Sequence, residues 1–371
     1  MSRTVKDFGL ACGILPQGTR NAITDVPGVQ VGHCTLRDGD INTGVTAILP
    51  HSGNLFRRKV VAASRVINGF GKSTGLVQID ELGTIETPIL LTNTLSVGTC
   101  TTALIREAIA QNPDIGRTTS TVNPVVGECN DGPLNDIQAL AVTEEHARAA
   151  LDAAHDGPVE QGSIGAGTGM TCFGFKGGIG SSSRRIELDG ADHHLGALVL
   201  TNFGNAGDLV LPNGLRPSPK MAEPPLKAQE RGSIIIVLAT DVPLEHRQLN
   251  RVAKRAGAGL ARLGSFWGHG SGDIAVAFTT ANTVDHDARA DLQDMRVLNE
   301  NRIDLLFRAA AEATQEAVLN SMLSADRFVG RGGQERVSLA DVLRGNQNAA
   351  YNNDLAEGAW KALPHGRALA P

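Results

Sequence analysis

The feature that most constrains this chain is a run of six consecutive apolar residues at positions 234–239, which begins directly after a proline-rich stretch. A short continuous apolar run of this kind is typical of a buried β-strand. Residues 211–231 hold five prolines and several charged side chains, so they are not expected to form a core element. The prolines within 212–225 predict either a linker between two domains or a surface loop that leads to a processing site.

The boundary between these two segments is Gly232-Ser233. Gly-Ser is a common turn dipeptide, and the pair needs no further role. Alternatively, a cut between the two residues would make Ser233 a chain N-terminus. Its α-amine, with an ordinary pKa of about 7.7–8.0, could then act as the base for its own hydroxyl, as in N-terminal nucleophile hydrolases. Because Gly232 has no Cβ, the hydroxyl could approach the glycine carbonyl at low steric cost, form an ester and leave water to free the amine.

Composition narrows the class of protein. The 371 residues are enough for two domains or one large domain, and the net charge of −5 without a Lys/Arg run argues against nucleic acid as a partner. The five cysteines show no CxxC or zinc-finger spacing, which predicts a reduced, metal-free interior without a cofactor. The polar N-terminus and the lack of a membrane-length apolar segment predict a cytoplasmic protein with no membrane partner.

Strands and helices are mixed without a regular strand–helix alternation, which favours an α+β layered architecture over a doubly wound sheet. The expected strands cover residues 22–32, 43–49, 84–91, 171–175, 196–203, 234–239 and 273–279. The expected helices cover residues 101–110, 144–154, 244–263, 301–323 and 338–343. Glycine-dense residues 162–180 are expected to form loops around the strand at 171–175.

Some motifs resemble ligand sites only in part. Residues 68–75 (NGFGKSTG) are similar to a phosphate-binding loop, but Val66 replaces the required glycine and residues 76–79 look like a strand, so nucleotide binding is not favoured. Residues 165–169 (GAGTG) lack dinucleotide-site spacing and predict close backbone approach around a pocket or an interface. The histidines show no metal-ligand spacing; they include His33, His51, His155, His193, His194 and His269.

A polar cluster at 268–273 (GHGSGD) contains Ser271 and Asp273. On an extended chain two residues that are two apart face the same side, so the hydroxyl and the carboxylate could together hold an ammonium group and relay its proton. An ordinary Gly/Ser/Asp turn has the same composition, and the residues alone leave both interpretations open.

Taken together and in this order, several motifs resemble the family of L-aminopeptidase/D-esterase-amidases and β-peptidyl aminopeptidases (DmpA-like). The resemblance runs over nearly the whole chain. The motifs are 23–33 (ITDVPGVQVGH), 43–50 (TGVTAILP), 87–98 (TPILLTNTLSVG), 125–132 (VVGECNDG), 165–170 (GAGTGM), 176–180 (KGGIG), 232–237 (GSIIIV) and 270–273 (GSGD).

The resemblance implies one domain over residues 1–371 that folds as an αββα sandwich, like N-terminal nucleophile hydrolases but with different connectivity. It implies self-cleavage between Gly232 and Ser233 into an α chain of residues 1–232 and a β chain of residues 233–371. It further implies a homotetramer of αβ pairs that releases N-terminal residues from small peptides, amides or esters without a metal.

Site residues also follow from the resemblance. Ser233 would be the nucleophile, with its freed α-amine as the base, and Ser271 and Asp273 would orient that amine and shuttle its proton. Asn202 would donate a hydrogen bond to the oxyanion. Glu128 would pair with the ammonium group of the substrate, which would explain aminopeptidase rather than endopeptidase action.

The chain departs from the family at one position. Some members carry a tyrosine near the residue that matches Glu128, whereas the single tyrosine here is Tyr351. In those members the tyrosine assists the oxyanion; here either Asn130, as a substrate-binding residue, substitutes as that donor or the role is empty. Two alternatives therefore stand beside the aminopeptidase: an amidohydrolase of the same fold that acts on another amide, such as a pantetheine-type substrate, and an inactive scaffold.

Overall fold

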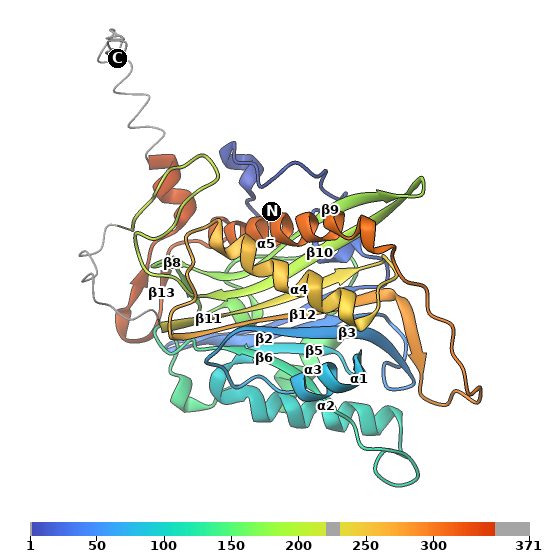
Figure 1. Cartoon of the computed structure of the whole chain (residues 1–371). Helices are drawn as coiled ribbons and strands as arrows, with labels where there is room; N and C mark the ends of the chain where they lie inside the picture. The colour runs from blue at the N-terminus through green and yellow to red at the C-terminus, as the bar shows by residue number, and fades with distance from the viewer. Residues whose placement is uncertain (1, 220–230, 346–371) are drawn as a thin grey trace, which may run out of the picture.

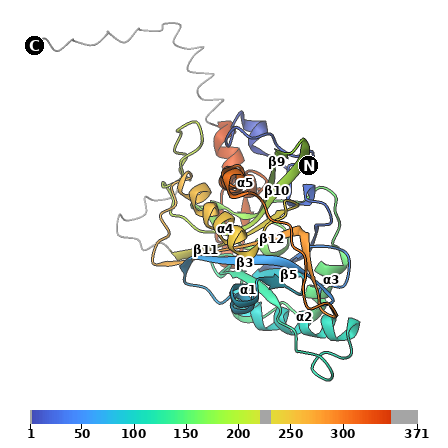
Figure 2. The ribbon, with the colours of Figure 1, turned by 45° about the vertical axis from the view of Figure 1, so that its right-hand side comes forward.

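The computed structural model describes residues 2–219 and 231–345. Two β-sheets lie face to face, and helices cover the outer face of each sheet, so the chain forms four layers (Figures 1 and 2). The expected αββα architecture is confirmed. Residues 220–225 of the proline-rich stretch and Tyr351 lie outside the described residues.

The larger sheet has six strands in the order β4-β3-β12-β11-β10-β9. Their bounds are β3 Arg58–Gly69, β4 Thr84–Ile85, β9 Gly178–Leu188, β10 Ala191–Asn202, β11 Arg231–Thr240 and β12 Gly270–Asp285. β11 and β12 run parallel, and the other neighbours are antiparallel. The parallel pair at the centre needs a crossover connection, which the helix α4 (His246–Ala261) supplies.

The smaller sheet has four strands in the order β1-β2-β5-β6. Their bounds are β1 Gln30–Asp38, β2 Ile41–Leu49, β5 Ile89–Asn93 and β6 Val125–Cys129. β5 and β6 are parallel, and helix α2 (Val97–Gln111) connects them. Two short hairpins complete the strands: β7 Thr171–Cys172 with β8 Phe175–Lys176, and β13 Phe328–Val329 with β14 Glu335–Arg336.

The helices divide between the two outer faces. α4 and α5 (Asp304–Leu323) pack on the six-stranded sheet, α2 and α3 (Glu144–Asp152) pack on the four-stranded sheet, and α1 (Leu76–Leu82) contacts β3 and β4. Short 3₁₀ helices cover Val5–Phe8, Ile23–Asp25, Thr94–Ser96, Ile137–Ala139, Gly165–Gly167, Glu300–Arg302 and Arg331–Gly333. Among the described residues no helix is both long enough and apolar enough to cross a membrane.

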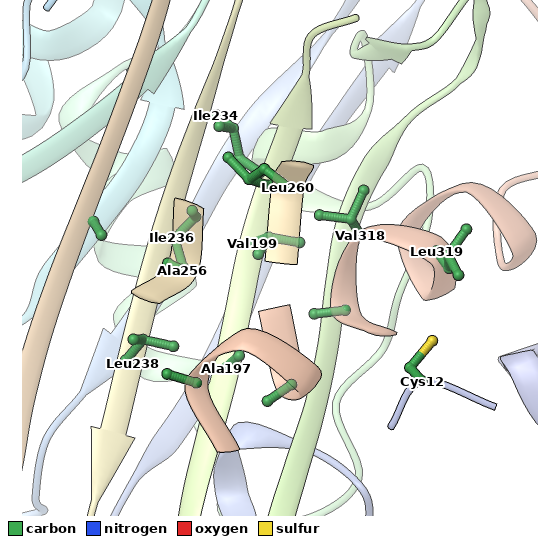
Figure 3. Close-up of a cluster of buried hydrophobic side chains, with 14 of the residues drawn as sticks. Cys12, Ala197, Val199, Ile234, Ile236, Leu238, Ala256, Leu260, Val318 and Leu319 are labelled. Atoms are coloured by element: carbon green, nitrogen blue, oxygen red, sulfur yellow. The ribbon is translucent and has the colours of Figure 1, made fainter. Parts of the chain in front are cut away.

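β11 explains why residues 234–239 are continuously apolar. Ile234 and Ile236 point toward α4 and α5, where Figure 3 shows them packed with Leu260 and other aliphatic side chains. Ile235 and Val237 point the other way, into the cluster between the two sheets. Burying one such side chain contributes about 1.5–3 kcal/mol. Because both faces of this strand are covered, every position must be apolar.

The four longer expected helices are confirmed as α2 to α5, and residues 339–345 are helical near the expected 338–343. Two expected strands are confirmed only in part, because turns interrupt them. In residues 22–32 the strand begins at Gln30, after a turn in which Gly28 has φ +90°. In residues 84–91 Pro88, which lacks an N–H donor, separates β4 from β5.

Three expectations were wrong. Residues 76–79 belong to the helix α1 and not to a strand. Residues 171–175 are not one strand: Thr171–Cys172 is β7, Phe173 and Gly174 form a two-residue turn with positive φ, and Phe175 begins β8. The third is the glycine-dense segment, which was expected to end in loops but contains the start of the eleven-residue strand β9.

Candidate active site

A cavity of about 680 Å³ lies where the ends of strands from both sheets meet. The end of β10 and the start of β11 and β12 form one side, the end of β6 forms another, and the segment after β3 contributes to the wall. The lining residues are Phe70, Lys72, Thr94, Glu128, Asn130, Pro133, Thr171, Asn202, Gly232, Ser233, His269 and Gly270.

Strand register sets the neighbours of Ser233. In the antiparallel pair β10–β11, Ser233 lies opposite Asn202, and in the parallel pair β11–β12 it lies opposite Gly272. Ser233 is 5 % exposed, so its hydroxyl lies at the wall of the cavity and not on the open surface. The side chain shares a strand face with Ile235 and therefore points toward the space between the sheets.

Gly232 packs against the backbone of β10. A Cβ at this position would lie 2.6 Å from the carbonyl oxygen of Asn202 and 2.7 Å from the Cα of Phe203. Both distances are shorter than any ordinary contact, so no larger residue fits without moving a strand. Glycine at the expected cleavage position is thus required by packing as well as by the chemistry inferred from the sequence.

The side-chain amide of Asn202 is held at both ends. Its Oδ1 accepts a hydrogen bond of 3.1 Å from the main-chain N–H of Thr171, and its Nδ2 donates one of 2.9 Å to the carbonyl of Asn130. These bonds define which end of the amide is the donor, and the bond to Asn130 uses one of the two Nδ2 hydrogens. The amide of Asn202, which lines the cavity and lies opposite Ser233 in the strand register, is therefore held in a fixed orientation.

Glu128 places a carboxylate at the cavity, although its side chain is only 3 % exposed. Its Oε1 accepts a 2.8 Å hydrogen bond from the main-chain N–H of Lys72, and its Oε2 accepts one from the hydroxyl of Thr94. Both donors are neutral, so neither of these hydrogen bonds balances the negative charge of the buried carboxylate. Such a group attracts an ammonium ion that enters the cavity.

Ser271 and Asp273 lie behind the cavity wall. The Ser271 hydroxyl donates to Oδ1 of Asp273 at 3.0 Å, which confirms that the two side chains share one side of the strand. In the register of β12 with β11 they lie opposite Gly232 and Ile234. They share the strand face of Ala275, toward the helices, whereas Ser233 points away from it. The pair therefore flanks the backbone around Ser233 and not its hydroxyl.

Asn130 lies at the exposed rim of the cavity, where its Oδ1 accepts a 2.9 Å hydrogen bond from the N–H of Gly132 in its own loop. The contact of Asn130 with the inner site is made by its main-chain carbonyl, which accepts from Asn202. Side-chain binding to a substrate remains a prediction for this residue.

Sequence reasoning did not single out Cys129, which is completely buried and forms a hydrogen bond with Ser233. Its Sγ also donates to the carbonyl of Leu200 at 3.5 Å. Burial and the neighbouring charge of Glu128 raise the pKa of the thiol well above its ordinary value, while the bond to Ser233 acts in the opposite direction. The thiol therefore stays protonated and is a neutral partner of the Ser233 hydroxyl.

The segment that resembles a phosphate-binding loop forms part of the cavity. Lys72 stacks on Phe70, with Nζ 4.4 Å from the ring centroid, and both residues line the site. A helix does follow this segment, contrary to expectation, but Val66 still replaces the glycine of a phosphate loop and the N–H of Lys72 donates to the carboxylate of Glu128. The loop therefore builds the wall of this cavity.

The other partial motifs have simpler roles. In the GAGTG segment a Cβ at Gly165 would lie 2.5 Å from Thr46 Oγ1, and one at Gly167 would lie 2.5 Å from the N of Ile179, so close backbone approach is confirmed. His269 is the histidine that lines the cavity. No group of three or more His, Cys, Asp or Glu side chains suited to a metal ion occurs in residues 2–219 and 231–345.

Comparison with known proteins gives one consistent result. Residues 21–336 match the sequence profile of peptidase family S58. Among characterised relatives, the β-peptidyl aminopeptidase BapA of Sphingosinicella microcystinivorans is 39 % identical over 352 residues, which cover 88 % of this chain and 87 % of the relative.

Two solved structures share the fold. The PH0078 protein from Pyrococcus horikoshii OT3 is 46 % identical, with a TM-score of 0.86 and coverage of 94 % of this chain and 99 % of its own. The L-aminopeptidase D-Ala-esterase/amidase of Ochrobactrum anthropi is 36 % identical, with a TM-score of 0.83 and coverage of 93 % and 99 %. The latter is described as a prototype for the serine aminopeptidases and a new variant of the Ntn hydrolase fold.

Proposed function

Because this chain belongs to peptidase family S58 and is an aminopeptidase, we propose that it cuts itself between Gly232 and Ser233 and uses the freed Ser233 as its nucleophile. The observation that carries the proposal is the arrangement at the cavity. A hydroxyl, an oriented amide nitrogen and a buried carboxylate, from Ser233, Asn202 and Glu128, line one space although they are far apart in sequence.

The proposed self-cleavage uses the Ser233 hydroxyl, the Gly232 carbonyl and a water molecule. The Ser233 hydroxyl attacks the Gly232 carbonyl carbon, the C–N bond breaks and the nitrogen takes up the proton, which leaves an ester between the two residues. Water then hydrolyses the ester. The products are a chain of residues 1–232 that ends in a carboxylate and a chain of residues 233–371 that begins with a free amine.

In turnover the free α-amine accepts the proton of the Ser233 hydroxyl as the oxygen attacks the substrate carbonyl. The Nδ2 of Asn202 donates to the oxyanion, and the scissile C–N bond breaks as the α-ammonium returns the proton to the leaving nitrogen. Water releases the acyl residue from the ester by the same steps. Ser271 and Asp273, on the other face of the strand, hold the amine and relay its proton.

Specificity for a free N-terminus follows from Glu128. A substrate whose ammonium group binds this carboxylate places its first carbonyl at Ser233, so one residue is released at a time. We therefore propose short peptides and amino-acid amides or esters as substrates, with β-amino acid and D-amino acid derivatives included because relatives are named for those activities. We further propose a tetramer of αβ pairs, as the resemblance implies; light scattering of the purified protein tests it.

The test of this function is the variant Ser233→Ala, compared with Ser52→Ala at an exposed serine as the control. We expect Ser233→Ala to remain a single chain and to hydrolyse no amino-acid p-nitroanilide, while the control is cut and active. A panel of L-, D- and β-amino acid substrates then defines the acyl group. A Ser233→Ala chain that is cut at this bond, or that turns over these substrates at the rate of the control, would contradict the proposal.

A further inference from the structure

Lys176 is a lysine with no exposed surface that lies beneath the candidate active site. Its Nζ donates to three main-chain carbonyls, those of Gly167 at 2.9 Å, Met170 at 2.9 Å and Gly177 at 2.7 Å. Three donors on one nitrogen are a property of the ammonium form, because a neutral amine has two hydrogens. Burial lowers the pKa of Lys176, and the three carbonyls stabilise the charge that burial disfavours.

Asp131 supplies the opposite charge. Its carboxyl group is also fully buried, its Oδ1 accepts a 3.0 Å hydrogen bond from Asn135, and the charges of Asp131 and Lys176 favour each other's ionised form. Asp131 follows β6, whereas Lys176 lies in the short strand β8. The attraction between these two buried charges therefore acts between two segments that border the cavity.

A residue from each of these two segments forms a hydrogen bond with the side-chain amide of Asn202. Thr171, whose N–H holds Oδ1 of Asn202, directly follows Met170, whose carbonyl is bound by Lys176. Asn130, whose carbonyl accepts from Nδ2 of Asn202, directly precedes Asp131. The residue that holds one end of the Asn202 amide, Thr171, is therefore the chain neighbour of Met170. The residue that holds the other end is the chain neighbour of Asp131.

The hairpin that carries Thr171 is anchored by a 2.8 Å main-chain hydrogen bond from Phe173 to the carbonyl of Phe203 and by the buried side chains of Phe173 and Phe175. β7 and β8 are two residues each, and strands this short contribute few main-chain hydrogen bonds to a hairpin. The ammonium group of Lys176 binds carbonyls on both sides of this hairpin, at Met170 and Gly177. Loss of that group would leave the carbonyls of Met170 and Gly177 without this donor, so that Thr171, which follows Met170, could shift relative to Asn202.

We propose that Lys176 is a positioning residue for the aminopeptidase reaction: through Met170 and Thr171 it holds the amide of Asn202 in the orientation that donates to the oxyanion. The inference rests on the proposed function, in which Asn202 is that donor. A misplacement of about 1 Å at a catalytic group costs on the order of 10²-fold in rate, similar to the loss of a whole oxyanion donor.

The experiment is a double-mutant cycle between Lys176→Met and Asn202→Ala in the full chain. Turnover of an amino-acid p-nitroanilide is divided by the fraction of chains that begin at Ser233, with incubations long enough for slow self-cleavage. We expect Lys176→Met alone to lower kcat about 10- to 100-fold with KM within twofold, because Glu128 is untouched. In the Asn202→Ala background the same change should alter kcat less than twofold, since the group it positions is gone.

Lys59→Met is the control, because it removes another lysine that is largely buried and charge-paired, with Glu86 at 2.5 Å, but that does not line the cavity. It should lower the melting temperature and leave kcat unchanged. Equal losses in both Asn202 backgrounds, or a rise in KM that accounts for the lost activity, would assign Lys176 a merely structural role and overturn the inference. An inactive wild type would instead contradict the proposed function.

If Lys176→Met does not fold, Asp131→Asn takes its place in the cycle. This variant keeps the acceptor for Asn135 and removes the charge that faces Lys176. We expect a kcat loss of several-fold that disappears in the Asn202→Ala background. A loss that persists there would overturn the inference in the same way.

Discussion

Replacement of Gly232 by alanine is the sharpest test of the link between packing and self-cleavage. The added Cβ would lie 2.6 Å from the Asn202 carbonyl oxygen and 2.7 Å from the Phe203 Cα, and ordinary contacts begin at 3.4 Å. Both opposing atoms are main-chain atoms, in the last residue of β10 and in the residue after it, so no side chain can rotate out of the way. β11 must therefore move by roughly 0.8 Å relative to β10 at the bond that is to be cut.

Two consequences follow from that displacement. Overpacking against a fixed backbone typically costs about 1–3 kcal/mol of folding stability. Because the Ser233 hydroxyl and the Gly232 carbonyl move relative to the Asn202 amide, we expect self-cleavage to slow by about 10²-fold, the cost of a misplacement close to 1 Å.

The assay follows the disappearance of the full-length chain after cell-free synthesis. Stability is compared separately in the uncut background, as Gly232→Ala/Ser233→Ala against Ser233→Ala, so that cutting does not confound the unfolding curve. Gly98→Ala is the matched control: this glycine is in α2, a Cβ there meets nothing within 4 Å, and the change should stabilise by up to about 1 kcal/mol. Cleavage of Gly232→Ala at the wild-type rate with unchanged stability would refute the reasoning.

Three further predictions concern groups around the cavity. Asn202→Ala should lower kcat by about 10²–10³-fold with little change in KM, measured on a p-nitroanilide; an unchanged kcat would exclude it as the oxyanion donor. Glu128→Gln should lower kcat/KM for amine-bearing substrates about 10- to 100-fold, the value of a charge-assisted bond, but leave self-cleavage unaffected because that step binds no ammonium; equal losses in both steps would contradict this. Burial raises the pKa of Asp131 to about 6, so the folded state holds this proton more tightly than the unfolded state and the group's contribution to stability falls as pH rises from about 4 to about 6. Asp131→Asn should remove that fall. The unfolding free energy of the variant minus that of the wild type should therefore increase by about 3 kcal/mol as the pH rises from about 4 to about 6; a pH-independent difference would refute the assignment.

The sequence predicts elements well where one physical signal dominates. Residues 234–239 are apolar because both faces of β11 are buried, and α4 and α5 carry long helical patterns. β9 has no such signal: it begins with glycines and serines because α5 packs so closely that a Cβ at Gly180 would lie 1.9 Å from the carbonyl of Ala317. Tertiary packing, which local propensity does not report, makes that segment a strand.

The site residues likewise divide into those with a local sequence signal and those without one. The residues alone indicate Ser233 as a candidate nucleophile and predict that Ser271 and Asp273 face the same side of an extended chain. Asn202 and Glu128 are indicated only by the resemblance to the family. Nothing local distinguishes them from other Asn and Glu residues, because their positions at the cavity depend on strand register between distant segments. Lys176 and Cys129 were missed for the same reason: their importance depends on burial and on partners elsewhere in the chain.

The measurement that tests the central claim most directly is the intact mass of freshly purified protein, with N-terminal sequencing of each chain. We expect two chains, of residues 1–232 and 233–371, the smaller beginning with Ser-Ile-Ile-Ile. A single uncut chain with full aminopeptidase activity, or a cut at another bond, would contradict the assignment of Ser233 as an N-terminal nucleophile.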